Sequence, residues 1–289
     1  DFDFDTDEQC RELQKLVSKW HGFDHGRIRI DAGIYAEYTS NYRLWEALAG
    51  YASEQNLGMQ LHLAENREEV DSCLDRTGMT PGQLLDFHRL FAVPATAAGC
   101  GCLSVEEAKL LGKKQATAVA LPLSDAKNGR GCAPILDLVK SGMNVALGTD
   151  GAIQAGNLDL FEVMRGAAMS VRASTGDPAA LPGSAALMMA TVCGARAQGR
   201  SAECGMLKEG MDADIVLVDF TAPHLMPCHN VITGLVYAAK GGDVAMTMVR
   251  GNILYQNGRF PTIDLNAVVE ELTGYAIPRL FAKEEDHVG

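Results

Sequence analysis

The stretch Asn144-Val-Ala-Leu-Gly-Thr-Asp-Gly151 contains a short apolar run that is followed at once by turn-forming residues. A run of this length is typical of a buried strand, and the Gly-Thr pair after it ends the strand. Such a strand delivers one carboxylate, Asp150, to its C-terminal end, which is where ligands and metals bind in parallel α/β sheets. Taken alone, the same residues fit an ordinary turn in which Asp150 caps the next helix equally well.

Similar short apolar runs alternate with amphipathic helical stretches from Arg27 to Val171. A regular alternation of strands and helices predicts a parallel sheet with helices outside it. The expected strands are 27–34, 59–64, 95–103, 116–123 and 144–148, and the expected helices are 43–55, 68–76 with 81–90, 105–111, 133–140 and 158–171.

The pattern changes after Pro182. An alanine-rich stretch predicts a helix over 183–197, and short strands are expected over 214–220, 244–250 and 253–256. Asn257-Gly258, directly after the last of these, is typical of a two-residue hairpin turn. We therefore expect an α/β segment over residues 1–204 and a β-rich C-terminal segment with a terminal helix over residues 205–289.

Composition narrows the classes of partner. The chain has 289 residues, of which 47% are hydrophobic and 21% charged, so it can bury a sizeable core. A net charge of -12 argues against nucleic acid or an anionic membrane as a partner. Without a membrane-spanning run or a signal-peptide pattern, we expect a cytoplasmic protein. The 8 scattered cysteines indicate free thiols rather than a disulfide framework.

The second expected strand ends in Leu61-His-Leu-Ala-Glu65, so a histidine and a carboxylate emerge together. A neutral imidazole binds divalent transition metals, and a nearby Glu can carry protons for a metal-bound water. Taken alone, a satisfied core histidine and a Glu at a helix start explain the pair more simply. Because the carboxyl ends of parallel strands share one edge, His62, Glu65 and Asp150 are expected to meet there.

Together these segments resemble the amidohydrolase superfamily, and within it the cytosine-deaminase-like branch of chlorohydrolases and of adenosylhomocysteine or methylthioadenosine deaminases. The resemblance covers nearly all of residues 10–270. Its motifs lie at 61–65, 84–94, 121–124, 132–134, 147–150 and 157–165, and in the C-terminal part at 205–219, 235–238 and 249–252.

The resemblance implies a (β/α)8 TIM barrel whose chain ends form a β-sandwich. The five strand-helix units fit strands four to eight, so we expect an incomplete barrel and a fragment of a longer protein. Family members hold zinc or iron with a His-x-His pair on the first strand, single histidines on the fifth and sixth, and an Asp on the eighth. By position, the resemblance implies that His62 is the fifth-strand ligand, Glu65 the acid/base partner, and Asp150 the eighth-strand ligand that also helps catalysis. The implied reaction is hydroxide attack on a carbon that bears a leaving amine or halide.

Three places depart from the family pattern, one of them at 154–157, where Gln-Ala-Gly-Asn stands in place of the usual Ser-Asn-Asn. Gly99 stands where the sixth-strand histidine is usual, and Tyr35 stands where a substrate-contacting histidine is usual. Strand alternation turns Cys100 away from the side of residue 99, and Cys102 lies near the loop, but a substitute thiolate ligand is disfavoured because thiolates usually bind zinc in larger sets. A catalytic metal site needs at least three protein ligands, and this sequence offers two. The sequence thus leaves open whether any metal binds.

Three hypotheses about function remain open. The first, implied by the resemblance, is a metal-dependent hydrolase of carbon–nitrogen bonds that acts on a small-molecule substrate, as either a deaminase or a chlorohydrolase of a nitrogen heterocycle. The second is a catalytically silent relative that binds a small ligand or a partner. The third, an unrelated α/β domain, is disfavoured by the number of matching motifs. A barrel without three strands exposes sheet edges, which predicts a homo-oligomer.

Overall fold

A parallel sheet forms the centre of the molecule. The structure is a computed structural model that describes residues 2–281, so the outer ends of the expected segments 1–204 and 205–289 lie outside it. Within the described residues the main sheet has five strands, all parallel, in the order β1-β2-β3-β4-β5. They are β1 (Ala32–Gly33), β2 (Met59–Leu63), β3 (Ala95–Gly99), β4 (Thr117–Ala120) and β5 (Asn144–Leu147). The predicted parallel α/β architecture is confirmed.

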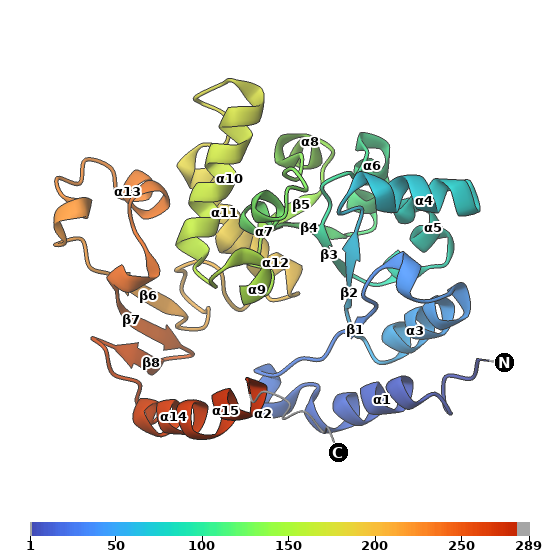
Figure 1. Ribbon diagram of the computed structural model, residues 1–289, viewed down its shortest axis with the longest axis horizontal. Helices are drawn as coiled ribbons and strands as arrows, with labels where there is room; N and C mark the ends of the chain where they lie inside the picture. The colour runs from blue at the N-terminus through green and yellow to red at the C-terminus, as the bar shows by residue number, and fades with distance from the viewer. Residues whose placement is uncertain (1, 282–289) are drawn as a thin grey trace, which may run out of the picture.

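Helices connect consecutive strands and pack around the outside of the sheet (Figure 1). Before β1 lie α1 (Glu8–Trp20) and the short α2 (Phe23–Gly26). The connections contain α3 (Tyr42–Glu54), then α4 (Arg67–Thr77) with α5 (Pro81–Phe87), then α6 (Val105–Lys113), then α7 (Pro122–Lys127) with α8 (Ile135–Lys140). After β5 come α9 (Ala152–Ala155), α10 (Leu160–Thr175), α11 (Gly183–Ala190) and α12 (Val192–Ala197). Short 3-10 turns lie at Glu37–Thr39, Leu90–Ala92, Pro223–Leu225 and Gly241–Asp243.

The first strand is much shorter than the predicted 27–34, because its N-terminal half is held elsewhere. The Arg200 guanidinium, just after α12, donates hydrogen bonds to the carbonyl oxygens of Gly26 and Arg27 at 3.1 and 3.0 Å. Arg29 likewise donates to the carbonyl of Gly199 at 3.1 Å. The Ile30 N–H donates to Nδ1 of His21 at 3.2 Å, so the backbone before Ala32 is bonded to the end of α1 and not to β2, and the paired residues are Ala32–Gly33.

Two further strands end earlier than predicted for local reasons. The fourth, expected to reach residue 123, ends at Ala120 because Pro122 begins α7, and proline is favoured in a first helical turn. The third, expected to reach residue 103, ends at Gly99, whose φ of 91° is incompatible with an extended strand. Both early endings leave loops at the C-terminal edge of the sheet.

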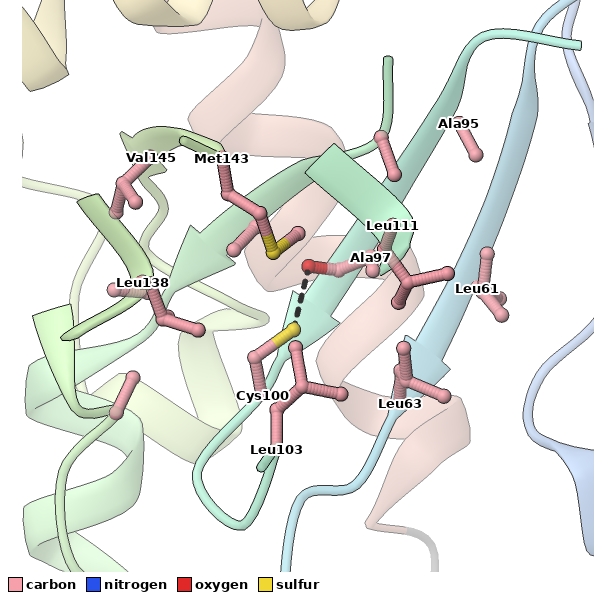
Figure 2. Packing of buried hydrophobic residues seen from close by; sticks show 14 of the residues in the cluster. Leu61, Leu63, Ala95, Ala97, Cys100, Leu103, Leu111, Leu138, Met143 and Val145 are labelled. Atoms are coloured by element: carbon pink, nitrogen blue, oxygen red, sulfur yellow. Dashed lines mark hydrogen bonds between the residues drawn. The ribbon is translucent and has the colours of Figure 1, made fainter. Parts of the chain in front are cut away.

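Apolar side chains fill the space between the sheet and its helices. Along β2, Met59, Leu61 and Leu63 are buried on the helix side, while Gln60 and His62 alternate to the inner face. Figure 2 shows part of this layer, in which the Cys100 thiol donates to the Ala97 carbonyl at 3.4 Å. Burying one such large apolar side chain contributes roughly 1.5–3 kcal/mol.

Close packing between β4 and β5 explains why residue 148, directly after β5, is a glycine. A Cβ on Gly148 would lie 2.7 Å from Cγ1 of Val119 on β4, so a larger residue would push β4 and β5 apart. The chain can then turn immediately after β5, and it places Asp150 at the edge of the sheet.

The inner face of the sheet is open. It lines a pocket of about 470 Å³ whose walls include Gln60, His62, Thr96 and Ala98. These residues lie on the face opposite the helix-packed core.

The C-terminal part forms a separate antiparallel sheet with the order β6-β7-β8 (Figure 1). Asn257 and Gly258 adopt φ angles of 46° and 81° after it, and Gln256 bridges Arg259, as expected for a tight turn. The predicted small β-rich element is confirmed.

No helix among residues 2–281 combines the length and the apolar character needed to cross a membrane. The elements are β6 (Ile215–Val218), α13 (Val231–Tyr237), which packs on α10 and α11, β7 (Val244–Val249), β8 (Asn252–Gln256), α14 (Leu265–Glu271), a π turn (Leu272–Ala276) and α15 (Ile277–Leu280).

Candidate functional site

The three residues predicted to meet lie around one pocket at the C-terminal edge of the sheet. His62 is on the inner face of β2, Glu65 is in the loop before α4, and Asp150 follows β5. All three line a pocket of about 340 Å³. The other lining residues are Tyr35, Asn128, Arg130 and Gln154. The role of each residue stays a prediction.

Glu65 is held through both its backbone and its side chain. The backbone N–H groups of Ala64 and Glu65 donate to the Glu69 carboxylate, each at 2.8 Å. Oε1 of the buried Glu65 carboxylate lies 3.0 Å from Nδ1 of His62. This hydrogen bond raises the pKa of His62. The pair therefore favours a charged imidazole next to a fixed carboxylate.

Asp150 is fixed at both carboxylate oxygens. Its backbone has a φ of 60°, the left-handed conformation that Asp tolerates better than most residues. The Gly151 N–H donates to Oδ1 at 2.8 Å, and the Ser124 hydroxyl donates to Oδ2 at 2.6 Å. The side chain therefore has a single orientation at the pocket wall.

Arg130 is a central residue of the site that sequence reasoning missed. Its Nη1 donates to Oε1 of Glu65 at 3.2 Å, and its Nη2 donates to the Ser124 hydroxyl at 2.9 Å. The same Nη2 is 3.8 Å from Oδ2 of Asp150, and Nε is 3.6 Å from Oδ1 of Asp125. One guanidinium thus links the ends of β2, β4 and β5. The motif at 121–124 placed a loop here, but no spacing in the sequence predicts that Arg130 turns back into the site.

Asp125, in α7, is the second residue that the sequence did not reveal. Its side chain is only 2% exposed, and burial raises its pKa to about 7. The positive charge of Arg130 lowers this pKa, whereas the negative charges of Glu65 and Asp150 raise it. The carboxyl group of Asp125 therefore changes its protonation state near neutral pH.

The departures at Gly99 and Tyr35 have structural consequences. A Cβ on Gly99 would lie 2.8 Å from Cγ of Glu65, so the present position of Glu65 leaves no space for a histidine there. The Tyr35 ring packs on the His62 ring with centroids 4.9 Å apart. Neither cysteine replaces the missing ligand, because the Cys100 thiol points to the Ala97 carbonyl and Cys102 does not line the pocket.

These donors do not fit a metal ion as they stand. Among residues 2–281, no three His, Cys, Asp or Glu side chains are grouped so that they could hold one. His62 uses Nδ1 for Glu65, and the guanidinium of Arg130 lies among the carboxylates. The site is instead a hydrogen-bonded network with its own cation.

Comparison with known sequences places these observations in a family. Residues 2–254 match the amidohydrolase family. The 5-methylthioadenosine/S-adenosylhomocysteine deaminase of Moorella thermoacetica is 40% identical over 258 residues, which cover 89% of this chain and 60% of that protein. The 5'-deoxyadenosine deaminase of Methanosarcina mazei is 38% identical, over 92% of this chain and 61% of that protein. The chain thus spans about 60% of the length of these relatives.

Solved structures agree with this assignment. An adenosine deaminase from Xanthomonas campestris with bound zinc superposes with a TM-score of 0.88 at 28% identity, over 92% of this chain and 60% of that one. Atrazine chlorohydrolase from Arthrobacter aurescens, complexed with zinc, gives a TM-score of 0.85 at 26% identity, over 91% and 58%. The predicted TIM-barrel-like fold is confirmed by these neighbours.

Proposed function

This chain belongs to the amidohydrolase family, and we propose that it takes part in hydrolysing a carbon–nitrogen bond of an amino-substituted nitrogen heterocycle. Adenosine derivatives are the favoured substrate class, because two deaminases of that class are 40% and 38% identical to it. A chlorinated heterocycle is the alternative substrate, supported by the likeness to atrazine chlorohydrolase. The observation that carries the proposal is the convergence of His62, Glu65 and Asp150 on one pocket.

The chain's own residues account for proton movement in such a reaction. Hydrolytic deamination adds water to the carbon and transfers a proton to the departing nitrogen. Glu65 is a buried carboxylate at the pocket wall, so we assign it this transfer from water to leaving group. His62, hydrogen-bonded to Glu65 at 3.0 Å, orients the carboxylate. Asp150 lies on another wall of the same pocket, where it can accept a hydrogen bond from the attacking water.

A metal ion is the cofactor that the family resemblance implies. Zinc or iron would supply a polarised water, but the donors present do not fit such an ion. We therefore infer no zinc or iron at this pocket while Arg130 occupies it, and we assign no step to a metal.

A second candidate function is binding without turnover. It is favoured by Arg130, whose guanidinium nitrogens lie 3.2–3.8 Å from three carboxylates, and by Gly99 in place of a histidine. A catalytically silent relative would use the same pocket to bind a small heterocyclic ligand or a partner.

Ammonia release from 5-methylthioadenosine and S-adenosylhomocysteine, combined with calorimetric binding, separates the two candidates. If the chain hydrolyses either compound, Glu65→Gln should lower kcat/KM by roughly 100-fold or more, because it removes the proton carrier. The matched control is Glu68→Gln, an exposed residue in the first turn of α4, which should leave the rate unchanged. Binding without ammonia release would support the silent relative, and neither binding nor release would contradict adenosine derivatives as the substrate or ligand in both candidates.

A further inference from the structure

Two side chains at the wall of the candidate site take no part in its hydrogen-bond network. Tyr35 and Gln154 line the same pocket of about 340 Å³ as His62, Glu65 and Asp150. The Tyr35 hydroxyl and the Gln154 side-chain amide make no hydrogen bond to any described residue. Both groups are therefore available to a ligand, in a pocket of the size that small molecules occupy.

The Tyr35 ring is held in place and yet remains exposed. The Tyr35 carbonyl accepts a hydrogen bond from the His62 N–H at 2.8 Å, which ties its backbone to β2. The ring lies 4.9 Å from the His62 ring and 6.4 Å from the Tyr38 ring, measured between centroids. Tyr35 is nevertheless 57% exposed. A fixed aromatic ring that is open to a pocket is a surface on which another planar ring can stack.

The Gln154 amide lies close to the backbone that follows Asp150. Gln154 is on α9, which packs on α7 and is held there because Nζ of Lys127 donates to the Ile153 carbonyl at 2.6 Å. A Cβ on Gly151 would lie 2.5 Å from Oε1 of Gln154. Gly151 has a φ of -69° and a ψ of 156°, which other residues adopt freely. The glycine is therefore needed for space, because it lets the amide approach the backbone.

We propose that Tyr35 and Gln154 position a planar nitrogen heterocycle in this pocket. The ring stacks on Tyr35, and the Gln154 amide pairs with an amino group and the neighbouring ring nitrogen. A primary amide presents a donor and an acceptor side by side, which matches this edge of an amino-substituted ring. The ligand class is taken from the proposed function, and the two roles are the same whether the ligand is hydrolysed or only bound.

Calorimetric titration with adenosine tests the stacking. All variants are made in a Glu65→Gln background, where turnover does not disturb the measurement of binding. Tyr35→Leu should weaken adenosine binding at least about tenfold, whereas Tyr35→Phe keeps the ring and should stay within about threefold. The control Tyr42→Leu removes a tyrosine of similar exposure on α3 and should leave the affinity unchanged.

Purine riboside, which lacks the amino group of adenosine, tests the pairing. We expect the Glu65→Gln chain to bind adenosine at least about fivefold more tightly than purine riboside, and added Gln154→Leu to reduce this preference below about twofold. Gly151→Ala should act in the same way, because its Cβ displaces the amide, and it should add nothing to Gln154→Leu. The control is Gln9→Leu, an exposed glutamine of α1.

The outcomes separate failure of this proposal from failure of the proposed function. If adenosine binds and Tyr35→Leu binds it equally well, Tyr35 does not position the ring, and the proposed function is unaffected. An undiminished preference for adenosine in Gln154→Leu would overturn the pairing in the same way. If neither the wild type nor Glu65→Gln binds either nucleoside, adenosine derivatives are excluded as the ligand class, and the roles of Tyr35 and Gln154 are overturned as well.

Discussion

At the scale of single residues, burial changes what a carboxyl group does. Burial raises the pKa of Asp125 from its ordinary 3.8 to about 7, despite the nearby positive charge of Arg130. A pKa that is higher in the folded state means that folding favours the protonated form. The stabilisation from this group is therefore present below the ordinary value and is lost as the pH rises through about 7.

Asp125→Asn should remove this pH dependence. Between about pH 5 and pH 8 we expect the free energy of unfolding of the wild type to fall by about 1–3 kcal/mol relative to the variant. Urea denaturation at several pH values measures the difference. Asp137→Asn, on the exposed side of α8, is the control and should show no such trend. A difference that stays constant across this range would contradict the expected proton uptake.

Gly99 offers a test of how tightly Glu65 is held. Gly99 and Gly142 have similar φ angles, 91° and 88°, but a Cβ on Gly99 meets Glu65 Cγ at 2.8 Å while one on Gly142 meets nothing within 4 Å. Gly142→Ala should therefore cost about 1–2 kcal/mol from backbone strain alone. Gly99→Ala should cost about 1–3 kcal/mol more, because Glu65 must move. Equal losses in urea denaturation would show that Glu65 yields freely.

At the scale of elements, the start of α4 positions Glu65. The helix is capped by Asn66, whose side chain accepts from the Glu69 N–H at 2.9 Å. Glu69 in turn accepts from the Ala64 and Glu65 N–H groups at the end of β2. The first turn of the helix thus supplies both oxygens that the strand end needs, and the strand, the loop and the helix set the position of Glu65 together.

Glu69→Gln should loosen this connection. Glutamine keeps one acceptor oxygen, so one of the two N–H groups loses its charged partner, at a cost of about 1–3 kcal/mol. Amide hydrogen exchange at Ala64 and Glu65 should accelerate with that loss. Glu68→Gln, an exposed neighbour, serves as the control. Unchanged exchange in Glu69→Gln would mean that the loop is held by other contacts.

At the scale of the whole molecule, the two sides of the main sheet differ. On one side, α12 packs against β5, and Nδ2 of Asn144 in β5 donates a hydrogen bond to the Cys193 carbonyl in α12 at 3.0 Å. Beyond β1, no further strand pairs among residues 2–281, and the inner face forms the pocket of about 470 Å³.

We also propose that the chain divides into residues 1–204 and 205–289, since the last helix packed on the main sheet ends at Ala197 and the second sheet begins at Ile215.

The open β1 edge and inner face lead us to expect a homo-oligomer. Light scattering coupled to gel filtration should give a mass above that of one chain, rising with concentration. Ala98→Glu places a charge on the inner face and should reduce association, whereas Ala179→Glu in an exposed turn should not. A concentration-independent monomer would contradict the expectation.

Much of the fold follows from local sequence. Apolar periodicity predicts each of the five parallel strands and the small C-terminal sheet, because burial of one face depends mainly on residues close in the chain. The strand ends were less predictable. The segment before β1 is held in part by Arg200, more than 170 residues away, whose hydrogen bonds to Gly26 and Arg27 no local pattern contains.

For the candidate site, too, some features follow from the sequence and others only from the tertiary structure. The sequence alone determined that His62, Glu65 and Asp150 stand at the ends of parallel strands, and parallel strands necessarily bring such ends to one edge. Only the tertiary structure decided that Arg130 turns into their midst and that Asp125 is buried beside it. The contact between Arg130 and Glu65 joins residues 65 positions apart through loops whose paths depend on the packing of the whole sheet, so a short motif cannot encode it.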